Sequence, residues 1–324
     1  MKTLTIFSDL AADEATLELL RKGVAPHELV LHAEPAATVL SKSAPAPALE
    51  TADIAFGQPD ADGVLRASRL RWLQISTAGY TRYDTPEFRA AAARRSLVVT
   101  NSSAVYAEPC AEHALAFMLG QARQLPWALA AGRAGDFTPW PQLRDRSRLL
   151  RHQRVLILGF GSIARHLVQL LRPFEMSIAA FRRQARGDEG VPIIGMEELP
   201  QALAKADHVV NVLPASPGTE RFMSAERFAT MKRGAVFYNL GRGATVDQEA
   251  LLAALNSGAL AAAWLDVTEP EPLPPGHPLL RAPSCFITPH IAGGHWKESE
   301  TLVRHFLDNF GRFLDGSALR DRVM

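Results

Sequence analysis

Three segments in the C-terminal half of the sequence carry side chains that can do chemistry. They are residues 239–243 (NLGRG), 266–272 (DVTEPEP) and 288–294 (TPHIAGG), and each comes at the end of an apolar run. Together they contain an arginine, several carboxylates and a histidine. A guanidinium binds an anion through a fixed fork of donors, and an imidazole exchanges a proton near neutral pH. These residue types indicate a site that binds a small polar ligand and transfers a proton.

A glycine-rich turn lies earlier in the same half. An apolar run leads into residues 159–164 (GFGSIA), and a helical pattern follows. In the pattern G-x-G-x-x-A, Gly159 makes a tight turn, Gly161 lets the backbone approach a pyrophosphate, and the small final residue lets the helix pack on the strand. The N–H groups at the start of the helix, beginning with Ser162 and Ile163, attract phosphates. We therefore expect a dinucleotide to bind here.

Two arginines follow the next apolar run, and they bear on which dinucleotide binds. NAD sites usually carry Asp or Glu about 20 residues after the glycines, where the carboxylate accepts from the ribose 2′-OH. This sequence has Arg182 and Arg183 there instead. Arginine binds a phosphate bidentately, so we expect NADP to be preferred over NAD. The alternative interpretation is a pair of solvated surface arginines.

The elements that would position these side chains form two series of alternating strands and helices. Strands are expected at residues 3–7, 28–32, 53–56, 72–76 and 97–100, and again at 155–158, 177–181, 208–213, 235–239, 260–266 and 286–288. Alternation with helical patterns predicts parallel sheets, which bind ligands at the carboxyl ends of their strands. The expected fold class is therefore α/β, with two Rossmann-like doubly wound parallel-sheet domains and a cleft between them.

The same pattern predicts domain boundaries. Residues 1–100 and 294–324 are expected to form the substrate (catalytic) domain, because the helical pattern near the C-terminus is too short to be a domain of its own. Residues 101–293 would form the dinucleotide-binding domain. Within that domain, residues 132–146 contain several glycines and prolines, so a connecting loop is expected there.

Composition excludes several classes of protein. The chain has 324 residues, of which 47% are hydrophobic and 21% charged, and its formal net charge is +1. These values favour a globular protein over a disordered, membrane-spanning or nucleic-acid-binding one. The two cysteines, Cys110 and Cys285, have no metal-ligand spacing, so neither a disulfide framework nor a metal site is expected. The N-terminus does not resemble a signal peptide, and a cytoplasmic location is expected.

Several motifs in this order resemble those of the D-isomer-specific 2-hydroxyacid dehydrogenase family, in particular its glyoxylate/hydroxypyruvate reductases. The resemblance covers nearly the whole chain and rests on Asn101 and on residues 76–79 (STAG), 111–113 (AEH), 159–164 (GFGSIA), 239–243 (NLGRG), 266–272 (DVTEPEP) and 288–294 (TPHIAGG). It implies an NADP- or NAD-dependent oxidoreductase that interconverts a small 2-keto acid and a 2-hydroxy acid by hydride transfer. Glyoxylate or hydroxypyruvate would be the substrate, and the enzyme would be a homodimer.

The resemblance also implies roles for individual residues. Arg242, Glu271 and His290 match the family's catalytic arginine, glutamate and histidine, and Arg242 would also bind the substrate. Asp266 matches the acid that contacts the nicotinamide amide. Further cofactor contacts are expected at Leu213 and Pro214, and the backbone N–H groups of Ala78, Gly79 and Tyr80 are expected to bind the substrate carboxylate.

The sequence leaves two alternatives. C-terminal-binding-protein corepressors share this fold and these motifs, so an NAD(P)-sensing interaction protein is a second class of function. A phosphoglycerate- or phosphite-type dehydrogenase is the other alternative, whereas formate dehydrogenases lack the glutamate found here as Glu271. Thr81 stands where the family often has an acid, which leaves the shape of the substrate loop open. His113 is expected to be a core residue, and Trp140, His295 and Trp296 have no assigned role.

Overall fold

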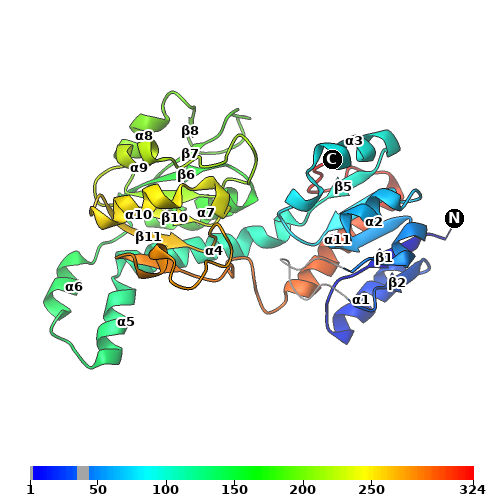
Figure 1. Cartoon of the computed structure of the whole chain (residues 1–324), viewed down its shortest axis with the longest axis horizontal. Helices are drawn as coiled ribbons and strands as arrows, with labels where there is room; N and C mark the ends of the chain where they lie inside the picture. Colours follow the sequence, from blue (N-terminus) through cyan, green and yellow to red (C-terminus); the bar gives the residue numbers. More distant parts are fainter. Residues whose placement is uncertain (1–2, 35–43) are drawn as a thin grey trace. The chain divides into compact units, whose positions relative to one another are not determined.

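The structure of the chain is a computed structural model that describes residues 3–34 and 44–324 (Figure 1). The chain divides into two compact units. The first consists of Met1–Tyr106 with Gly294–Met324, and the second of Ala107–Gly293. Each unit is built on a parallel sheet with helices, which confirms the predicted α/β class with two Rossmann-like parallel-sheet domains.

The first unit has a five-stranded parallel sheet in the order β2-β1-β3-β4-β5. Its strands are β1 (Thr5–Ser8), β2 (Glu28–Leu31), β3 (Ile54–Gly57), β4 (Trp72–Ile75) and β5 (Val98–Thr100). Its helices are α1 (Glu14–Val24), α2 (Ala61–Arg66), α3 (Pro86–Arg95) and the C-terminal α11 (Glu298–Asp315). A further helix, α4 (Ser103–Ala122), begins in this unit and continues into the second.

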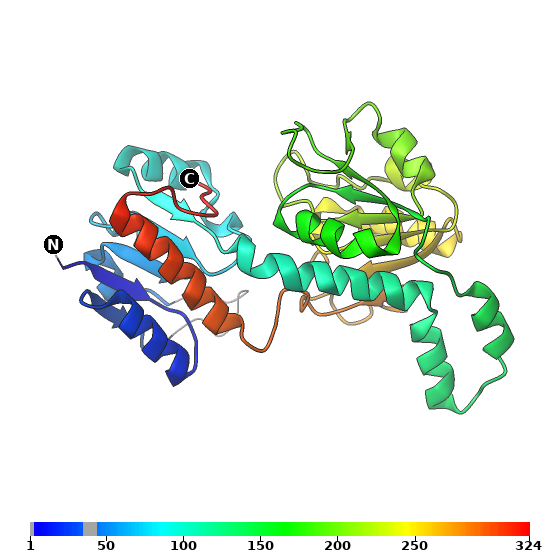
Figure 2. The same cartoon turned by 180° about the vertical axis from the view of Figure 1, so that it is seen from behind.

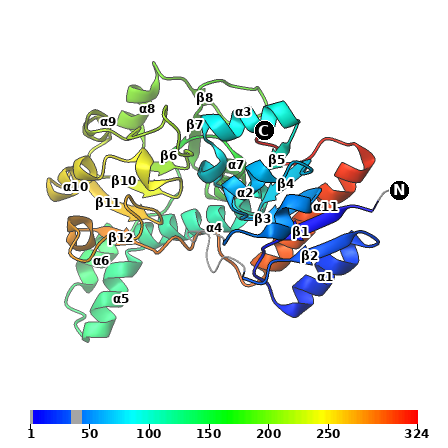
Figure 3. The ribbon, with the colours of Figure 1, turned by 45° about the vertical axis from the view of Figure 1, so that its right-hand side comes forward.

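Helix α11 lies beside α1 and packs on the sheet of the first unit (Figures 2 and 3). The ring of Phe306 stacks on Phe56 at 4.4 Å and on Trp72 at 5.2 Å between centroids. All three side chains are fully buried, so the last helix of the sequence completes the core that the first strands begin. The chain therefore returns to its starting unit after the second one has been built.

The second unit has a seven-stranded parallel sheet in the order β12-β11-β10-β9-β6-β7-β8. Its strands are β6 (Arg154–Leu158), β7 (Ser177–Phe181), β8 (Ile193–Ile194), β9 (His208–Asn211), β10 (Ala235–Asn239), β11 (Leu260–Leu265) and β12 (Cys285–Ile287). Its helices, besides most of α4, are α5 (Leu125–Ala134), α6 (Trp140–Arg146), α7 (Ser162–Leu171), α8 (Leu199–Lys205), α9 (Ala225–Thr230) and α10 (Gln248–Asn256). The short strand β8 was not predicted, because a two-residue strand leaves no alternating pattern in the sequence.

The strand order of the second unit reverses between β6 and β9, which are neighbours in the sheet. The chain winds outward through β7 and β8 on one side of this point, and through β10, β11 and β12 on the other. Open α/β sheets bind ligands at such a switch point, beyond the carboxyl ends of the strands. This topology places the ends of β6 and β9 next to each other at the predicted dinucleotide site.

The prediction of a connecting loop at residues 132–146 was wrong. Helix α5 continues to Ala134, and α6 occupies most of the remaining segment. The residues that suggested a loop mark helix ends instead, since Pro141 lies in the first turn of α6 and Gly135 is the left-handed C-cap of α5. Neither helix buries a residue, and the pair projects from the body of its unit (Figure 1).

Across residues 3–34 and 44–324, no helix is both long enough and apolar enough to cross a membrane.

Candidate active site

The glycine-rich turn connects β6 to α7 at the switch point. Gly159 has φ +96°, and a Cβ built on it would lie 3.3 Å from both the Val212 carbonyl oxygen and Leu213 Cδ2. Only glycine fits this conformation and this close approach of two backbones. Gly161 is the N-cap of α7 with open space beside it, so Ser162 and the residues after it present free N–H groups there.

A pocket of about 550 Å³ lies at the same edge of the sheet. Five residues of the predicted cofactor set line it, namely Gly159, Arg182, Arg183, Leu213 and Pro214. Residues that were not predicted also line it, among them Arg186, Met196, Ser216, Thr219 and Phe222. Arg186 could have been found from the sequence, because it is a third arginine in the same short segment as the first two.

Arg182 already has a partner within the protein. Its Nη1 donates to Glu189 Oε1 at 3.0 Å, and the side chains of Arg182 and Glu189 are 18% and 3% exposed. Arg183 and Arg186 are exposed and form no ion pair with any residue that the structure describes. The three arginines at this pocket therefore differ. Arg182 is held by a hydrogen bond to Glu189, whereas Arg183 and Arg186 are exposed to solvent.

The predicted catalytic glutamate and histidine lie in contact. His290 Nδ1 is 2.9 Å from Glu271 Oε1, although the ring N–H does not point straight at an acceptor among the described residues. Neither side chain is fully buried, with 31% of His290 and 22% of Glu271 exposed. The contact is therefore a close ion pair when His290 is protonated, with the ring accessible from one side.

Arg242 belongs to the same cluster. Burial lowers the pKa of its guanidinium, while the nearby charge of Glu271 opposes that change. Arg242 stays cationic in any case, because arginine is not deprotonated in proteins. Its Nη1 donates to the Gly241 carbonyl at 2.7 Å, which fixes one edge of the guanidinium. Arg242, Glu271 and His290 thus bring a cation, an anion and a proton carrier to the ends of β10, β11 and β12.

The backbone between these residues is tightly packed. A Cβ on Gly243 would lie 2.0 Å from the Thr268 carbonyl oxygen, so the segment after β10 rests directly on the segment after β11. Buried amides hold the first segment, since Asn211 Nδ2 donates to Asn239 Oδ1 at 2.9 Å and to Thr245 Oγ1 at 2.7 Å. Sequence reasoning assigned no role to Asn211 or Thr245, because buried hydrogen-bonding residues have no spacing signal of their own.

Asp266 fixes the loop that carries His290. Its carboxylate is almost fully buried and accepts from the Thr288 hydroxyl at 2.6 Å and from the backbone N–H groups of Ile291 and Ala292, each at 2.9 Å. His113 Nε2 lies 3.9 Å from the same carboxylate. Burial lowers the pKa of His113, so the neutral ring packed on Phe117 fits the predicted core role.

The predicted substrate loop belongs to the first unit. The carbonyl of Ala78 accepts from Asn101 Nδ2 at 2.7 Å, and the carbonyl of Gly79 accepts from the Thr77 hydroxyl at 2.6 Å. Within the part of the chain that the structure describes, the backbone N–H groups of Ala78, Gly79 and Tyr80 donate to no acceptor. Backbone donors in a loop held through its carbonyls suit an anionic ligand.

Three residues without an assigned role lie at the surface or near it. Trp140 on α6 is 61% exposed and Trp296 is 89% exposed, with Lys297 Nζ 4.5 Å from the centre of its ring. His295 Nδ1 accepts from the backbone N–H of Lys297 at 3.3 Å. The contacts of these side chains do not tie them to the cluster of Arg242, Glu271 and His290.

Comparisons with known proteins agree with these features. The profile described as "D-isomer specific 2-hydroxyacid dehydrogenase, NAD binding domain" matches residues 115–292. A glyoxylate reductase/hydroxypyruvate reductase from Mus musculus is 34% identical over 254 residues, which cover 78% of this chain and 76% of that protein.

Two solved structures are similar over nearly their whole length. A D-isomer specific 2-hydroxyacid dehydrogenase from Xanthobacter autotrophicus, in complex with NADPH and MES, has a TM-score of 0.79 and 28% identity, covering 100% of this chain and 98% of that one. An NADPH-dependent glyoxylate/hydroxypyruvate reductase from Sinorhizobium meliloti, in complex with NADP and malonate, has a TM-score of 0.76 and 25% identity, covering 99% and 97%.

Proposed function

The chain belongs to the D-isomer specific 2-hydroxyacid dehydrogenase family and is an NAD(P)-dependent oxidoreductase that transfers a hydride to a small 2-keto acid, and from this premise we propose that it reduces glyoxylate and hydroxypyruvate with NADPH. The cluster of Arg242, Glu271 and His290 carries the proposal, because it supplies the groups that such a reduction needs. When bound, the nicotinamide supplies the hydride.

The three side chains have distinct proposed tasks. Arg242 binds the carboxylate of the 2-keto acid and polarises its carbonyl oxygen with fixed donors. His290 gives a proton to that oxygen as the carbonyl carbon is reduced. Glu271, at 2.9 Å from His290 Nδ1, holds the ring in place. Oxidation of the 2-hydroxy acid uses the same groups in reverse, with His290 as the base.

Substrate binding is proposed to use backbone donors as well. The N–H groups of Ala78, Gly79 and Tyr80 would receive the substrate carboxylate, and their freedom from other acceptors among the described residues supports this role. Because the loop is held by Asn101 and Thr77 through carbonyl groups, these donors need not reorganise to bind an anion.

Cofactor binding is proposed to use the turn at Gly159, Gly161, Ser162 and Ile163 for the pyrophosphate. The pocket at the end of β7 fits the adenosine ribose of NADPH, because it is lined by Arg182, Arg183 and Arg186 with no competing carboxylate on its wall. Leu213 and Pro214, which follow β9, would pack against the cofactor from the other side of β6. Asp266 is proposed to face the nicotinamide end, although its oxygens already accept from the His290 loop.

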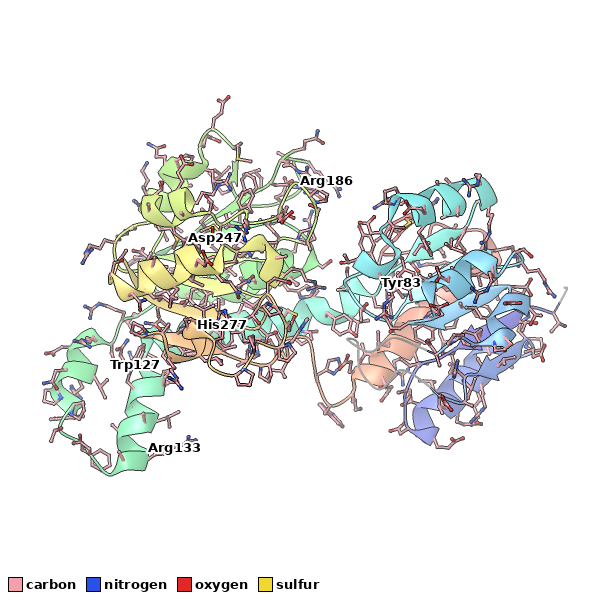
Figure 4. All side chains as sticks on the ribbon, viewed as in Figure 1. Tyr83, Trp127, Arg133, Arg186, Asp247 and His277 are labelled. Carbon is pink, nitrogen blue, oxygen red and sulfur yellow. The ribbon has the colours of Figure 1, made fainter. Side chains whose placement is uncertain are left out.

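We also propose a homodimer in which a second copy covers α5 and α6. Leu125, Leu129, Phe137 and Trp140 are 47%, 63%, 71% and 61% exposed on these two helices and the segment between them. Apolar side chains gathered on a projecting segment are typical of an interface (Figure 4 labels Trp127 and Arg133 on α5). A cytoplasmic location stays a prediction.

A panel of steady-state assays tests the proposed function. The purified protein is assayed with NADPH and NADH against glyoxylate, hydroxypyruvate and pyruvate, and with NADP+ and NAD+ against phosphite, and His290→Ala serves as the control. We expect turnover of glyoxylate and hydroxypyruvate with NADPH that falls by about 10²–10⁴-fold in His290→Ala, the typical worth of general acid catalysis. Tight NADPH binding without turnover of any substrate would instead favour a nucleotide-sensing interaction protein. Oxidation of phosphite would favour a phosphite-type dehydrogenase.

A further inference from the structure

The loop after β7 encloses a buried acid that the proposed mechanism does not use. Glu189 lies among exposed residues, yet its side chain is only 3% exposed. Its carboxylate accepts from the backbone N–H groups of Arg186 at 2.7 Å and Gly187 at 2.9 Å, and from Arg182 Nη1 at 3.0 Å. One carboxylate therefore joins the start and the end of this loop.

These contacts determine the position of Arg182. Its guanidinium has five N–H donors, and the contact with Glu189 occupies one end of the fork. Arg182 is also one of the residues that line the pocket of about 550 Å³, and 18% of its side chain is exposed, so part of its fork of donors stays open to a ligand. The backbone donors of Arg186 and Gly187 hold Glu189 in turn, and the Arg186 N–H is the largest cause of the lowered pKa of that carboxyl.

Arg183 and Arg186 have no such support. Both line the pocket, both are exposed, and neither forms an ion pair with a described residue (Figure 4 labels Arg186 at the edge of its unit). A flexible exposed arginine loses side-chain entropy when it binds a phosphate, whereas an arginine already held in place loses little. Among the described arginines at this pocket, Arg182 is thus the one whose guanidinium the protein orients before a ligand arrives.

We propose that Glu189 is a positioning residue for recognition of the 2′-phosphate of NADP(H). Glu189 holds the Arg182 guanidinium so that the remaining donors of Arg182 face the pocket. This inference rests on the proposed preference for NADPH. Glu189 does not touch the cofactor, and it acts through Arg182. Its negative charge alone would repel a phosphate, so positioning and charge have opposite effects, and the sign of a substitution effect separates the two.

The test compares adenosine 2′,5′-bisphosphate with 5′-AMP, two fragments that differ in the 2′-phosphate and need no catalysis. Dissociation constants are measured by titration calorimetry for the full chain, for Glu189→Gln and for Asp188→Asn. Asp188→Asn is the matched control, because it also removes one negative charge from this loop, and Asp188 pairs with Arg165 and not with Arg182. We expect Glu189→Gln to weaken binding of the bisphosphate about tenfold, roughly one hydrogen bond to a charged group, and to change 5′-AMP binding less than about twofold.

Asp188→Asn is expected to leave bisphosphate binding unchanged or slightly tighter. The second measurement repeats Glu189→Gln in an Arg182→Ala background, where the tenfold effect should disappear if Glu189 acts through Arg182. A loss that persists in that background would show a general role in loop folding and overturn the proposal. Glu189→Asp keeps the charge and shortens the side chain, so it provides the same comparison if Glu189→Gln does not fold.

The remaining outcomes are also decisive. Tighter bisphosphate binding by Glu189→Gln would show that charge outweighs positioning and would overturn the proposal. If the unsubstituted chain binds both fragments equally, the preference for NADPH fails, and the role of Glu189 fails with it. If the unsubstituted chain prefers the bisphosphate and Glu189→Gln does so to the same degree, only the role of Glu189 fails.

Discussion

The hydroxyl of Thr288 donates a 2.6 Å hydrogen bond to Oδ1 of Asp266, across the ends of the neighbouring strands β12 and β11. The same carboxylate accepts from the backbone of Ile291 and Ala292, which follow His290 directly. The backbone of His290 has φ +53°, a conformation that is uncommon for residues other than glycine. The hydrogen bonds to the buried Asp266 thus hold the loop in the shape in which His290 contacts Glu271.

Thr288→Val should therefore weaken both the fold and the reaction. Valine keeps the shape of the side chain but donates no hydrogen bond to the buried carboxylate, and such bonds are worth about 1.5–3 kcal/mol. We expect a loss of that order in the free energy of unfolding, measured by urea titration, together with a several-fold lower kcat. Thr301→Val, which removes an exposed hydroxyl bonded to Lys297 within α11, should change the stability by less than about 0.5 kcal/mol. Equal effects of the two substitutions would show that the bond to Asp266 is not important.

Glu271→Gln should slow the reduction. The carboxylate lies 2.9 Å from His290 Nδ1, and an amide of the same shape makes a weaker contact with the ring because it carries no charge. We expect kcat to fall by about tenfold, roughly the worth of one charge-assisted contact, while the Kd for NADPH stays unchanged. The control is Glu269→Gln, an exposed glutamate two positions away, whose kcat should match that of the unsubstituted enzyme. An unchanged kcat in Glu271→Gln would remove Glu271 from the mechanism.

Arg242→Lys should impair catalysis although the substitution keeps the positive charge. A lysine is a point charge and cannot reproduce the planar fork that binds a carboxylate and a carbonyl together. We expect kcat/KM for the 2-keto acid to fall by about 10²–10³-fold, the cost of losing one fixed donor, while the Kd for NADPH stays unchanged. Arg233→Lys, at an exposed position, should have no effect on either quantity. Near-normal kinetics in Arg242→Lys would contradict the proposed fork.

His208 should make the stability of the second unit depend on pH. Burial lowers its pKa from 6.5 to about 4, and its ring is held between the Tyr238 hydroxyl at 2.9 Å and Gln153 Oε1 at 2.7 Å. Between pH 6.5 and 4 the unfolded chain binds a proton at this residue that the folded chain does not, so the free energy of unfolding falls as the pH falls. This contribution is on the order of 3 kcal/mol over the window.

His208→Gln removes the titrating group, so the free energy of unfolding should vary less with pH between 4 and 6.5 than in the unsubstituted chain. Urea titrations at several pH values provide the measurement. The control is His152→Asn, at an exposed histidine with φ +63°, a backbone conformation that asparagine tolerates. An identical pH dependence in His208→Gln and the unsubstituted chain would refute the assignment.

Leu129→Glu should convert the proposed dimer into monomers. Leu129 is 63% exposed on α5. If a second copy covers this position, a glutamate there loses its hydration, and burying an unpaired charge costs free energy. Light scattering at micromolar concentration should report twice the chain mass for the unsubstituted protein and a single chain mass for the variant. Leu280→Glu alters a leucine that is 51% exposed outside α5 and α6, and it should stay dimeric. A monomeric unsubstituted protein would overturn the proposed homodimer.

Much of the fold could be predicted because parallel strands in such sheets are apolar along their whole length. The runs before Gly159, Arg242 and His290 were visible for this reason, and each polar residue after a run was a reasonable site candidate. Strand β8 was missed because two residues cannot show a period. The helices at residues 125–146 were missed because Pro141 and Gly135 are compatible with a helix start and a helix end as well as with a loop.

The site could be predicted from the sequence where its segments match the motifs of the family. Arg242, Glu271 and His290 were named from that match, and the structure brings the three together. The residues that hold them were not found, since Asn211 and Thr245 look like ordinary polar residues until their buried partners are known. Glu189 was overlooked for a related reason, because a glutamate near Arg186 and Asp188 in a polar segment is expected to be exposed to solvent.

The loop that holds Arg182 and Glu189 follows β7, on the opposite side of the switch point from β10, β11 and β12. Under the proposed preference for NADPH, a variant that exchanges only the segment from 182 to 189 for one with an acid at its start would therefore favour NADH. It would keep Arg242, Glu271 and His290 unchanged. Relatives that run the same reaction in opposite metabolic directions could arise in this way through a few neighbouring codons.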